Sequence, residues 1–330
     1  MGKPIHPNEA LFAGEPALPV LAACEHYAGR ERQMLKALEL QAELGPVFDL
    51  TCDCEDGATV GAEREHAAMV ASVLASPANR FRRAGVRIHD HDHPSWRDDL
   101  EIILSRAGDR VAYITLPKVT SAAKAASTIE TIQSLALRQG LKRDIPIHVL
   151  IETHGGLREA WQIAALPWMQ TLDFGLLDFV SSHAGAIPAS AMRSPGQFEH
   201  HLVVRAKTEI VAAALAHGLV PAHNITAGID DPDATEADAR RAREEFGFLR
   251  MYSIHPAQIP PIVNAMKPDP VEIERASDIL LGAQAADWGP IRHGADMHDR
   301  ASYRYFWRVL STARACGMRL PAAAEAAFFH

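Results

Sequence analysis

The order of apolar and helical segments constrains the fold of this chain more than any other feature. Short apolar runs alternate with longer helical segments eight times between residues 18 and 266. The expected strands span 18–23, 47–53, 84–88, 111–117, 145–151, 171–175, 219–225 and 248–254. The expected helices span 29–42, 61–75, 95–106, 121–139, 156–165, 196–217, 233–246 and 256–266. Strands that are near-continuous apolar runs are typical of a parallel sheet buried on both faces, so the pattern predicts an α/β fold.

The number of strand–helix units favours a closed TIM (β/α)8 barrel, which we expect to occupy residues 1–267. A doubly wound open sheet is the alternative, but no G-x-G-x-x-G motif follows the first expected strand. Residues 268–330 form a C-terminal extension with two further expected helices, the second ending near Gly317. Such an extension caps an end of the barrel, covers the site or packs on a neighbouring subunit.

Charge and composition exclude several classes of function. The net charge is −8 and there is no long basic run, so we expect no nucleic-acid partner. No apolar stretch approaches the roughly 18 residues that a membrane helix needs, and the first residues lack an apolar signal core. Four cysteines are too few for a disulfide framework, which is typical of a reducing cytosol. We therefore expect a cytoplasmic protein with a small-molecule substrate and no membrane partner.

Polar side chains follow the expected strands at the point where each strand ends. They are Asp53, Glu55, Asp56, Arg87, Lys118, Glu152, Asp178, His223, Asn224 and His255. In barrel enzymes the carboxyl ends of the strands meet at one face, where the active site lies. The sequence therefore predicts a single polar pocket at that face.

The residue types in this pocket indicate a kind of chemistry. Acidic groups from different strands suit a hard cation such as Mg²⁺, which prefers oxygen ligands and keeps several waters. An arginine and a lysine nearby suit an anionic substrate, because arginine can hold a carboxylate through two parallel hydrogen bonds. A metal ion beside a cation can polarise a carbonyl and stabilise an enolate. The pattern points to making or breaking a carbon–carbon bond beside a carbonyl.

The same stretches resemble the HpcH/HpaI aldolase and citrate lyase beta-subunit-like family. "DCEDGA" looks like the family's D-L-E-D-A, and "VRI", "LPKV", "LIETHGG", "FGLLDF" and "GFLRMYSIHPAQI" follow in the family's order. "MKPDPVEIERASDIL" and "GADMHDRASYRYFWRVL" resemble its later segments, so that the likeness covers most of the chain.

The resemblance implies a TIM-type barrel that assembles as a homotrimer or hexamer. It also implies Mg²⁺-dependent cleavage of a 3-hydroxyacyl-CoA ester of the malyl-CoA, citramalyl-CoA or citryl type. The products would be a 2-oxo acid and an acyl-CoA, and the reverse reaction is equally implied. The implied metal ligands are Glu152 and Asp178. The implied catalytic residues are Arg87, Glu55 and Asp299, and the substrate-binding residues are Arg87, Lys118 and Asp56. Asp299 matches a late aspartate that serves a neighbouring subunit's site as acid or base.

Several positions depart from the family pattern. The first strand end lacks the V-P-G turn and reads "AACEHYAG", and Glu63 stands near the position of a lysine in acyl-CoA members. These departures leave two alternatives open. One is a CoA-independent aldolase that acts on a free hydroxy-oxo acid. The other is a non-catalytic metal- or ligand-binding paralogue, or a subunit of a lyase complex.

Some eye-catching residues have simpler interpretations. Cys52 and Cys54 form a C-x-C without a second pair, so buried packing is favoured over zinc. The "HDHDHP" run favours a solvated loop over a metal site, with His89 the best placed of its histidines. Lys118 could serve only to pair with the acidic cluster, and Glu152 could simply favour a helix N-terminus. An aromatic group is expected to pack in a core or interface, namely Tyr303, Tyr305, Phe306 and Trp307.

Overall fold

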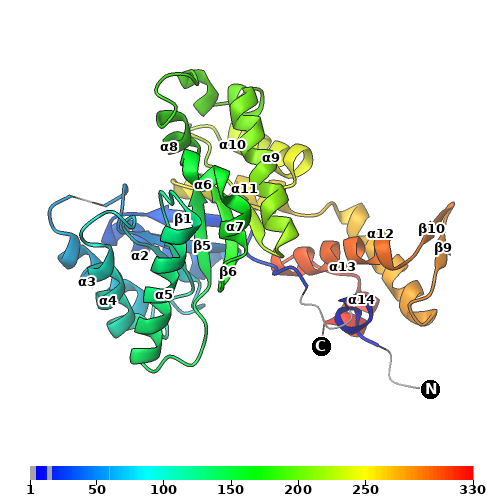
Figure 1. Ribbon diagram of the computed structural model, residues 1–330. Coiled ribbons are helices and arrows are strands. Elements are labelled where there is room, and N and C mark those ends of the chain that lie inside the picture. Colours follow the sequence, from blue (N-terminus) through cyan, green and yellow to red (C-terminus); the bar gives the residue numbers. More distant parts are fainter. Residues whose placement is uncertain (1–4, 13–16, 59, 330) are drawn as a thin grey trace. The chain divides into compact units, whose positions relative to one another are not determined.

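The computed structural model describes residues 5–12, 17–58 and 60–329 of the chain (Figure 1). The chain forms two compact units. The barrel unit is Ala22–Met266, and the terminal unit joins Met1–Leu21 to Lys267–His330. Within the described ranges, no helix is long and apolar enough to cross a membrane. Parts of the N-terminal stretch in which we expected no signal core, residues 1–4 and 13–16, lie outside the described residues.

The barrel unit is a closed barrel of eight parallel strands in sequence order, in which the last strand pairs with the first. The strands are β1 (Cys24–Ala28), β2 (Phe48–Asp53), β3 (Ala84–Arg87), β4 (Ile114–Leu116), β5 (Ile147–Ile151), β6 (Met169–Phe174), β7 (Val220–His223) and β8 (Arg250–Ser253). The predicted TIM (β/α)8 fold is therefore confirmed, and the open sheet is excluded.

Helices connect successive strands of the barrel unit, as the alternating pattern predicted. They are α2 (Glu31–Leu44), α3 (Glu63–Ala75), α4 (Trp96–Ala107), α5 (Ala122–Arg138), α6 (His154–Arg158), α7 (Ala160–Ala164), α8 (Leu176–Ser181), α9 (His201–Ala216), α10 (Pro232–Phe246) and α11 (Ile259–Met266). Short 3-10 turns are η1 (Ala189–Met192), η2 (Gly196–Phe198) and η3 (Pro256–Gln258). The expected helix at 156–165 is in fact two short helices, and the one expected at 196–217 begins only at His201.

The first expected strand, at 18–23, was wrong: β1 begins at Cys24. We had read Glu25 as a polar group beyond the strand, but it lies inside β1 and is fully buried. Thr51 donates a hydrogen bond to Glu25 at 2.6 Å, and Arg250 Nη1 lies 3.3 Å from its other oxygen. A buried charge is tolerated when partners compensate it, so the strand can continue through a glutamate.

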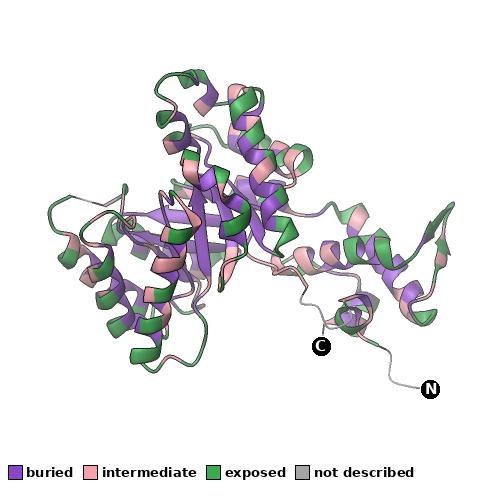
Figure 2. Cartoon of the chain, in the orientation of Figure 1, coloured by how far each residue is buried: buried purple, intermediate pink, exposed green. Residues whose placement is uncertain are grey.

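The interior of the barrel is polar, which the interpretation of the strands as apolar runs did not predict. Thr51 on β2 hydrogen-bonds to Tyr113, just before β4, at 2.7 Å. Arg250 on β8 donates to Asp49 on β2 at 2.7 Å. These pairs join strands that are not neighbours, so the contacts run through the interior. Side chains alternate along a strand, and the apolar residues therefore face the helices. The strands are buried along their length (Figure 2).

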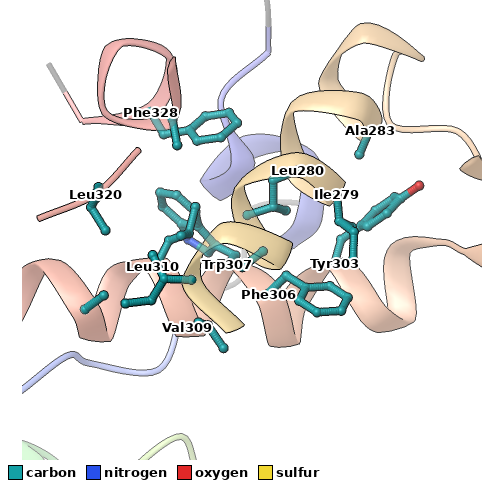
Figure 3. Close-up of a cluster of buried hydrophobic side chains, with 14 of the residues drawn as sticks. Ile279, Leu280, Ala283, Tyr303, Phe306, Trp307, Val309, Leu310, Leu320 and Phe328 are labelled. Atoms are coloured by element: carbon teal, nitrogen blue, oxygen red, sulfur yellow. The ribbon is translucent and has the colours of Figure 1, made fainter. Parts of the chain in front are cut away.

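The terminal unit has its own apolar core. It contains α1 (Pro7–Phe12), α12 (Pro270–Ala285), α13 (Arg300–Ala315), α14 (Ala322–Phe328) and a hairpin of β9 (Ile291–His293) and β10 (Asp296–His298). Figure 3 shows Trp307 and Phe306 of α13 beside Leu280 of α12. Tyr303, Phe306 and Trp307 are buried in this core, which confirms their expected packing, whereas Tyr305 is 56% exposed.

Candidate active site

A cavity of about 550 Å³ lies where the barrel strands end. Six of the residues that we expected in one pocket line it together, namely Asp53, Asp56, Arg87, Glu152, Asp178 and Asn224. They end or follow β2, β3, β5, β6 and β7, so the barrel brings them to one face as predicted. Apolar groups form much of the remaining wall, chiefly Tyr27, Leu150, Ile225 and Tyr252.

Glu152 directly follows β5 and is held from two sides. Its Oε1 accepts a hydrogen bond from the backbone N–H of Lys118 at 2.6 Å. Lys118 has a φ of +48°, a left-handed conformation that is uncommon outside glycine and marks functional segments. On the other side, a Cβ added at Gly175 would lie 2.0 Å from Glu152 Oε2. Gly175 therefore leaves the space that the carboxylate occupies.

Glu152 and Asp178 are two carboxylates that line the same cavity, and Arg87 is the cation nearby. Asp178 lies in the first turn of α8, which begins one residue after Gly175. Burial, and then the negative charge of Asp178, raise the pKa of Glu152 to about 8. Among the described residues, no lysine or arginine forms an ion pair with either carboxylate. A hard cation fits such a pair, because Mg²⁺ takes one or two carboxylates and keeps waters or substrate oxygens in its other positions.

Arg87 ends β3 and is anchored by carboxylates of the β2 loop. It donates two hydrogen bonds to Asp53, at 2.7 and 2.5 Å, and its Nη1 lies 3.1 Å from Glu55. Asp53 also accepts from the backbone N–H groups of Glu55 and Gly57, at 3.0 and 2.8 Å. The sequence had placed Asp53 at the strand end but gave it no role. Its position shows that it orients the guanidinium at the pocket wall.

Lys118 pairs with the acidic loop rather than lining the main cavity. Its Nζ donates hydrogen bonds to Glu55 and, at 2.9 Å, to Asp56. Glu55 is thus held by both Lys118 and Arg87, and burial raises its pKa. Lys118 therefore pairs with the acidic cluster, which is the simpler of the two interpretations of its sequence position. Lys118 and Glu55 do not line the cavity, whereas Asp56 and Arg87 of this network do.

Other sequence-based candidates lie elsewhere. Asp299 belongs to the terminal unit, where its carboxylate caps α13 by accepting from the Ala301 N–H at 2.9 Å. Its expected action in a neighbouring subunit stays a prediction. Cys52 and Cys54 are buried free thiols, in agreement with the packing interpretation. His89 hydrogen-bonds to Asp99 at 2.7 Å, and no metal-binding group among the residues searched contains it.

Two tyrosines were missed as pocket residues. The rings of Tyr27 on β1 and Tyr252 on β8 lie 5.4 Å apart, and the Arg87 guanidinium lies 5.3 Å from the Tyr27 ring. Tyr252 donates its hydroxyl hydrogen to the carbonyl of Phe174. The period-two alternation of strands could have revealed Tyr27, since it points to the same side of β1 as Glu25.

Comparison with known proteins identifies a family and similar structures. The HpcH/HpaI aldolase/citrate lyase family matches residues 47–256. The structure resembles that of a citrate lyase from Burkholderia xenovorans LB400, with 53% sequence identity and a TM-score of 0.86, over 98% of this chain and 100% of that one. It also resembles CitE from Mycobacterium tuberculosis, solved with magnesium, acetoacetate and coenzyme A, with 22% identity and a TM-score of 0.66 over 90% and 98% of the two chains. That second likeness concerns the fold alone.

Two groups of relatives have curated activities. An L-malyl-CoA/beta-methylmalyl-CoA lyase of Cereibacter sphaeroides is 27% identical over 210 residues. The match covers 61% of this chain and 66% of that protein, just under two thirds of its length. A (3S)-malyl-CoA thioesterase of the same species is 28% identical over 267 residues, 80% of this chain and 82% of that protein. The family match and the identity with the Burkholderia protein lead to one conclusion: this chain belongs to the HpcH/HpaI aldolase/citrate lyase family.

Proposed function

We propose that this protein is a Mg²⁺-dependent carbon–carbon lyase that cleaves a 3-hydroxyacyl-CoA ester of the malyl-CoA, citramalyl-CoA or citryl type. The products are a 2-oxo acid and an acyl-CoA, and the reverse reaction uses the same groups. The observation that carries the proposal is that Glu152 and Asp178, neither of which forms an ion pair among the described residues, line one cavity with Arg87. Membership of a lyase family and the malyl-CoA relatives support the choice of substrate class.

The pocket residues have different roles in the proposed reaction. Glu152 and Asp178 would hold Mg²⁺, which when bound would polarise the carboxylate and carbonyl oxygens of the 2-oxo acid. Arg87 keeps N–H groups beyond those that bind Asp53 and Glu55, and these can donate to the oxyanion that develops as the bond breaks. Asp53 prevents the guanidinium from turning away, so the donors are oriented before the substrate arrives.

Bond cleavage needs proton transfers at both fragments. The 3-hydroxyl loses its proton as the carbon–carbon bond breaks, and its oxygen becomes the carbonyl of the 2-oxo acid. The acyl-CoA leaves as an enolate, which must gain a proton at carbon. From the resemblance, we propose that Glu55, whose carboxylate lies 3.1 Å from Arg87 Nη1, accepts the hydroxyl proton. From the resemblance alone, we propose Asp299 of a neighbouring subunit in a homotrimer or hexamer as the acid for the enolate.

Thioester hydrolysis is a second candidate function, and a specific observation favours it. The malyl-CoA thioesterase match covers 80% of this chain, against 61% for the malyl-CoA lyase match. Both activities begin from the same thioester, and they differ in which bond breaks. The free-acid aldolase remains the alternative that requires no CoA.

The test supplies the purified full chain with malyl-CoA and Mg²⁺, or with a free hydroxy-oxo acid and Mg²⁺, and identifies the products by mass spectrometry. The lyase predicts glyoxylate and acetyl-CoA in equal amounts. Malate with free CoA would assign hydrolysis instead, and an oxo acid formed only from a free hydroxy-oxo acid would assign the aldolase. Glu152→Gln should abolish turnover, whereas the exposed Glu130→Gln on α5 should leave it unchanged. Full activity in Glu152→Gln would refute the proposed metal site.

A further inference from the structure

A second group of potential metal ligands lies deeper in the barrel than the pocket. Glu25 on β1, His148 on β5 and Asp173 on β6 each offer one ligand atom, and these atoms lie within 4.8 Å of one another. All three residues are fully buried, at 0% exposure. Glu25 precedes the pocket residue Tyr27 by two positions, and Asp173 precedes the pocket residue Gly175 by two. His148 precedes the pocket residue Glu152 by four positions. The group therefore lies beneath the pocket, inside the barrel.

Several buried polar atoms of this group make no hydrogen bond. They are Glu25 Oε2, His148 Nδ1 and both carboxylate oxygens of Asp173, although Glu25 Oε2 lies 3.3 Å from Arg250 Nη1. Leaving a buried polar atom without a hydrogen bond is unfavourable, and more so for a charged group. Four such atoms that face one another make an occupant favourable, and that occupant must be attractive to carboxylate oxygens.

The hydrogen bond on the far side of the histidine ring fixes which nitrogen is free. His148 Nε2 lies 3.0 Å from Gln170 Oε1, which accepts the ring N–H. In the neutral ring, Nδ1 then presents a lone pair towards Glu25 Oε2 at 3.4 Å. Two lone pairs that face each other require a positive species between them. A histidine that ligates a metal is typically oriented in this way, with its other ring nitrogen donating to an oxygen.

The spacing distinguishes a proton from a metal ion. A charge-assisted N–H···O bond is about 2.7–2.9 Å long, so 3.4 Å is too wide for a shared proton. Two ligands that each lie about 2.0–2.1 Å from a tetrahedral ion are separated by roughly 3.4 Å. The distance between His148 Nδ1 and Glu25 Oε2 therefore equals the edge of a tetrahedral coordination site.

The surrounding charges permit a divalent ion. Arg250 Nη1 lies 3.3 Å from Glu25 Oε2, and this nearby cation opposes metal binding. Arg250 also donates to Asp49 at 2.7 Å, a carboxylate that it shares with Arg83. Glu25 and Asp173 then supply the two negative charges that a divalent ion needs. The competing arrangement places protons on His148 and Asp173 and contains no metal.

We propose that Glu25, His148 and Asp173 form a second metal site, buried in the barrel and separate from the pocket, for a divalent transition-metal ion such as Zn²⁺. One imidazole nitrogen with two carboxylates is a donor set that suits zinc better than Mg²⁺, which prefers oxygen ligands alone. The bound ion ties β1 to β5 and β6 across the barrel interior. The proposal does not depend on the proposed reaction.

The test measures zinc in the full-length protein produced in zinc-supplemented medium and then dialysed against EDTA. Elemental analysis should find about one zinc per chain in the wild type, because a fully buried ion exchanges slowly. Asp173→Asn and His148→Gln should lose this zinc, and circular dichroism establishes that each variant is folded. Glu152→Gln is the matched control, since it removes a pocket carboxylate and should retain the zinc.

Anomalous diffraction data from crystals of the wild type, collected at the zinc absorption edge, test the site without any variant. An anomalous peak between Glu25 Oε2, His148 Nδ1 and Asp173 is the expected result. No zinc and no peak would overturn the proposal in favour of protons. Zinc that disappears in Glu152→Gln but persists in Asp173→Asn would also overturn it, because the ion would belong to the pocket. Retained zinc with full activity in Glu152→Gln would instead refute the proposed lyase site.

Discussion

Replacing Glu152 by glutamine should make the metal-free protein more stable, although the residue is a proposed metal ligand. In the absence of a cation, burial and the charge of Asp178 raise the pKa of Glu152 from 4.5 to about 8. Between these values the folded state holds a proton that the unfolded state has released. Stability therefore falls as pH rises from 4.5 towards 8, because the unfolded state binds fewer protons there.

The size of this change in stability follows from the difference between the pKa values of Glu152 in the unfolded and folded states. Each pH unit above 4.5 costs about 1.4 kcal/mol, so that the cost at pH 7 is about 3 kcal/mol. Glutamine has nearly the same shape and cannot ionise, and its carbonyl oxygen can still accept from the Lys118 N–H. We expect Glu152→Gln to gain about 3 kcal/mol at pH 7 and under about 1 kcal/mol at pH 5.

Mg²⁺ should remove most of this difference in stability at pH 7. A ligand that binds only the folded state at 100 times its dissociation constant contributes about 2.7 kcal/mol. The wild type should gain this amount on adding Mg²⁺, and Glu152→Gln should gain little. Urea unfolding at pH 5, 7 and 8, with EDTA or with Mg²⁺, measures each term, and the exposed Glu130→Gln serves as the control. A variant that is less stable than the wild type in EDTA at pH 7, yet stabilised equally by Mg²⁺, would refute the assignment of Glu152.

Three further predictions follow from the geometry. Gly175→Ala would place a Cβ 2.0 Å from Glu152 Oε2 and should weaken Mg²⁺ binding by about 10–100-fold in calorimetric titration, whereas Gly228→Ala, with open space around it, should have no effect. Unchanged binding in Gly175→Ala would show that this carboxylate is free to move without cost. Arg87→Lys keeps the charge but cannot make both hydrogen bonds to Asp53, so kcat should fall about 100-fold, with wild-type turnover as the contrary result. All four cysteines are buried, and a thiol reagent at pH 8 should react only after denaturant is added; rapid labelling of the native protein would contradict this burial.

Much of the site could be predicted from the sequence because its residues stand at strand ends. An apolar run of limited length ends in a polar group, and a closed parallel barrel brings all such groups to one face. This reasoning placed Asp56, Arg87, Glu152 and Asp178 correctly in one cavity. It also gave the strand–helix order, since the period of the apolar residues is a local property of the chain.

The positions that the sequence misplaced depend on partners that are distant in the chain. Glu25 and His26 lie beyond the first expected strand, 18–23, but inside β1, where the buried charge of Glu25 is compensated by partners distant in the chain. The role of Asp53 was missed because its partner, Arg87, lies on the next strand and 34 positions away.

The alternating pattern of apolar runs and helices was sufficient to give the barrel and the face on which its pocket lies, because both follow from interactions along the chain. The polar interior was decided only by the tertiary structure. Arg250 and Asp49 are 201 positions apart and meet because β8 closes the barrel beside β1. Whether a buried charge is compensated depends on which strands face one another across the barrel, and this geometry exists only once the sheet has closed.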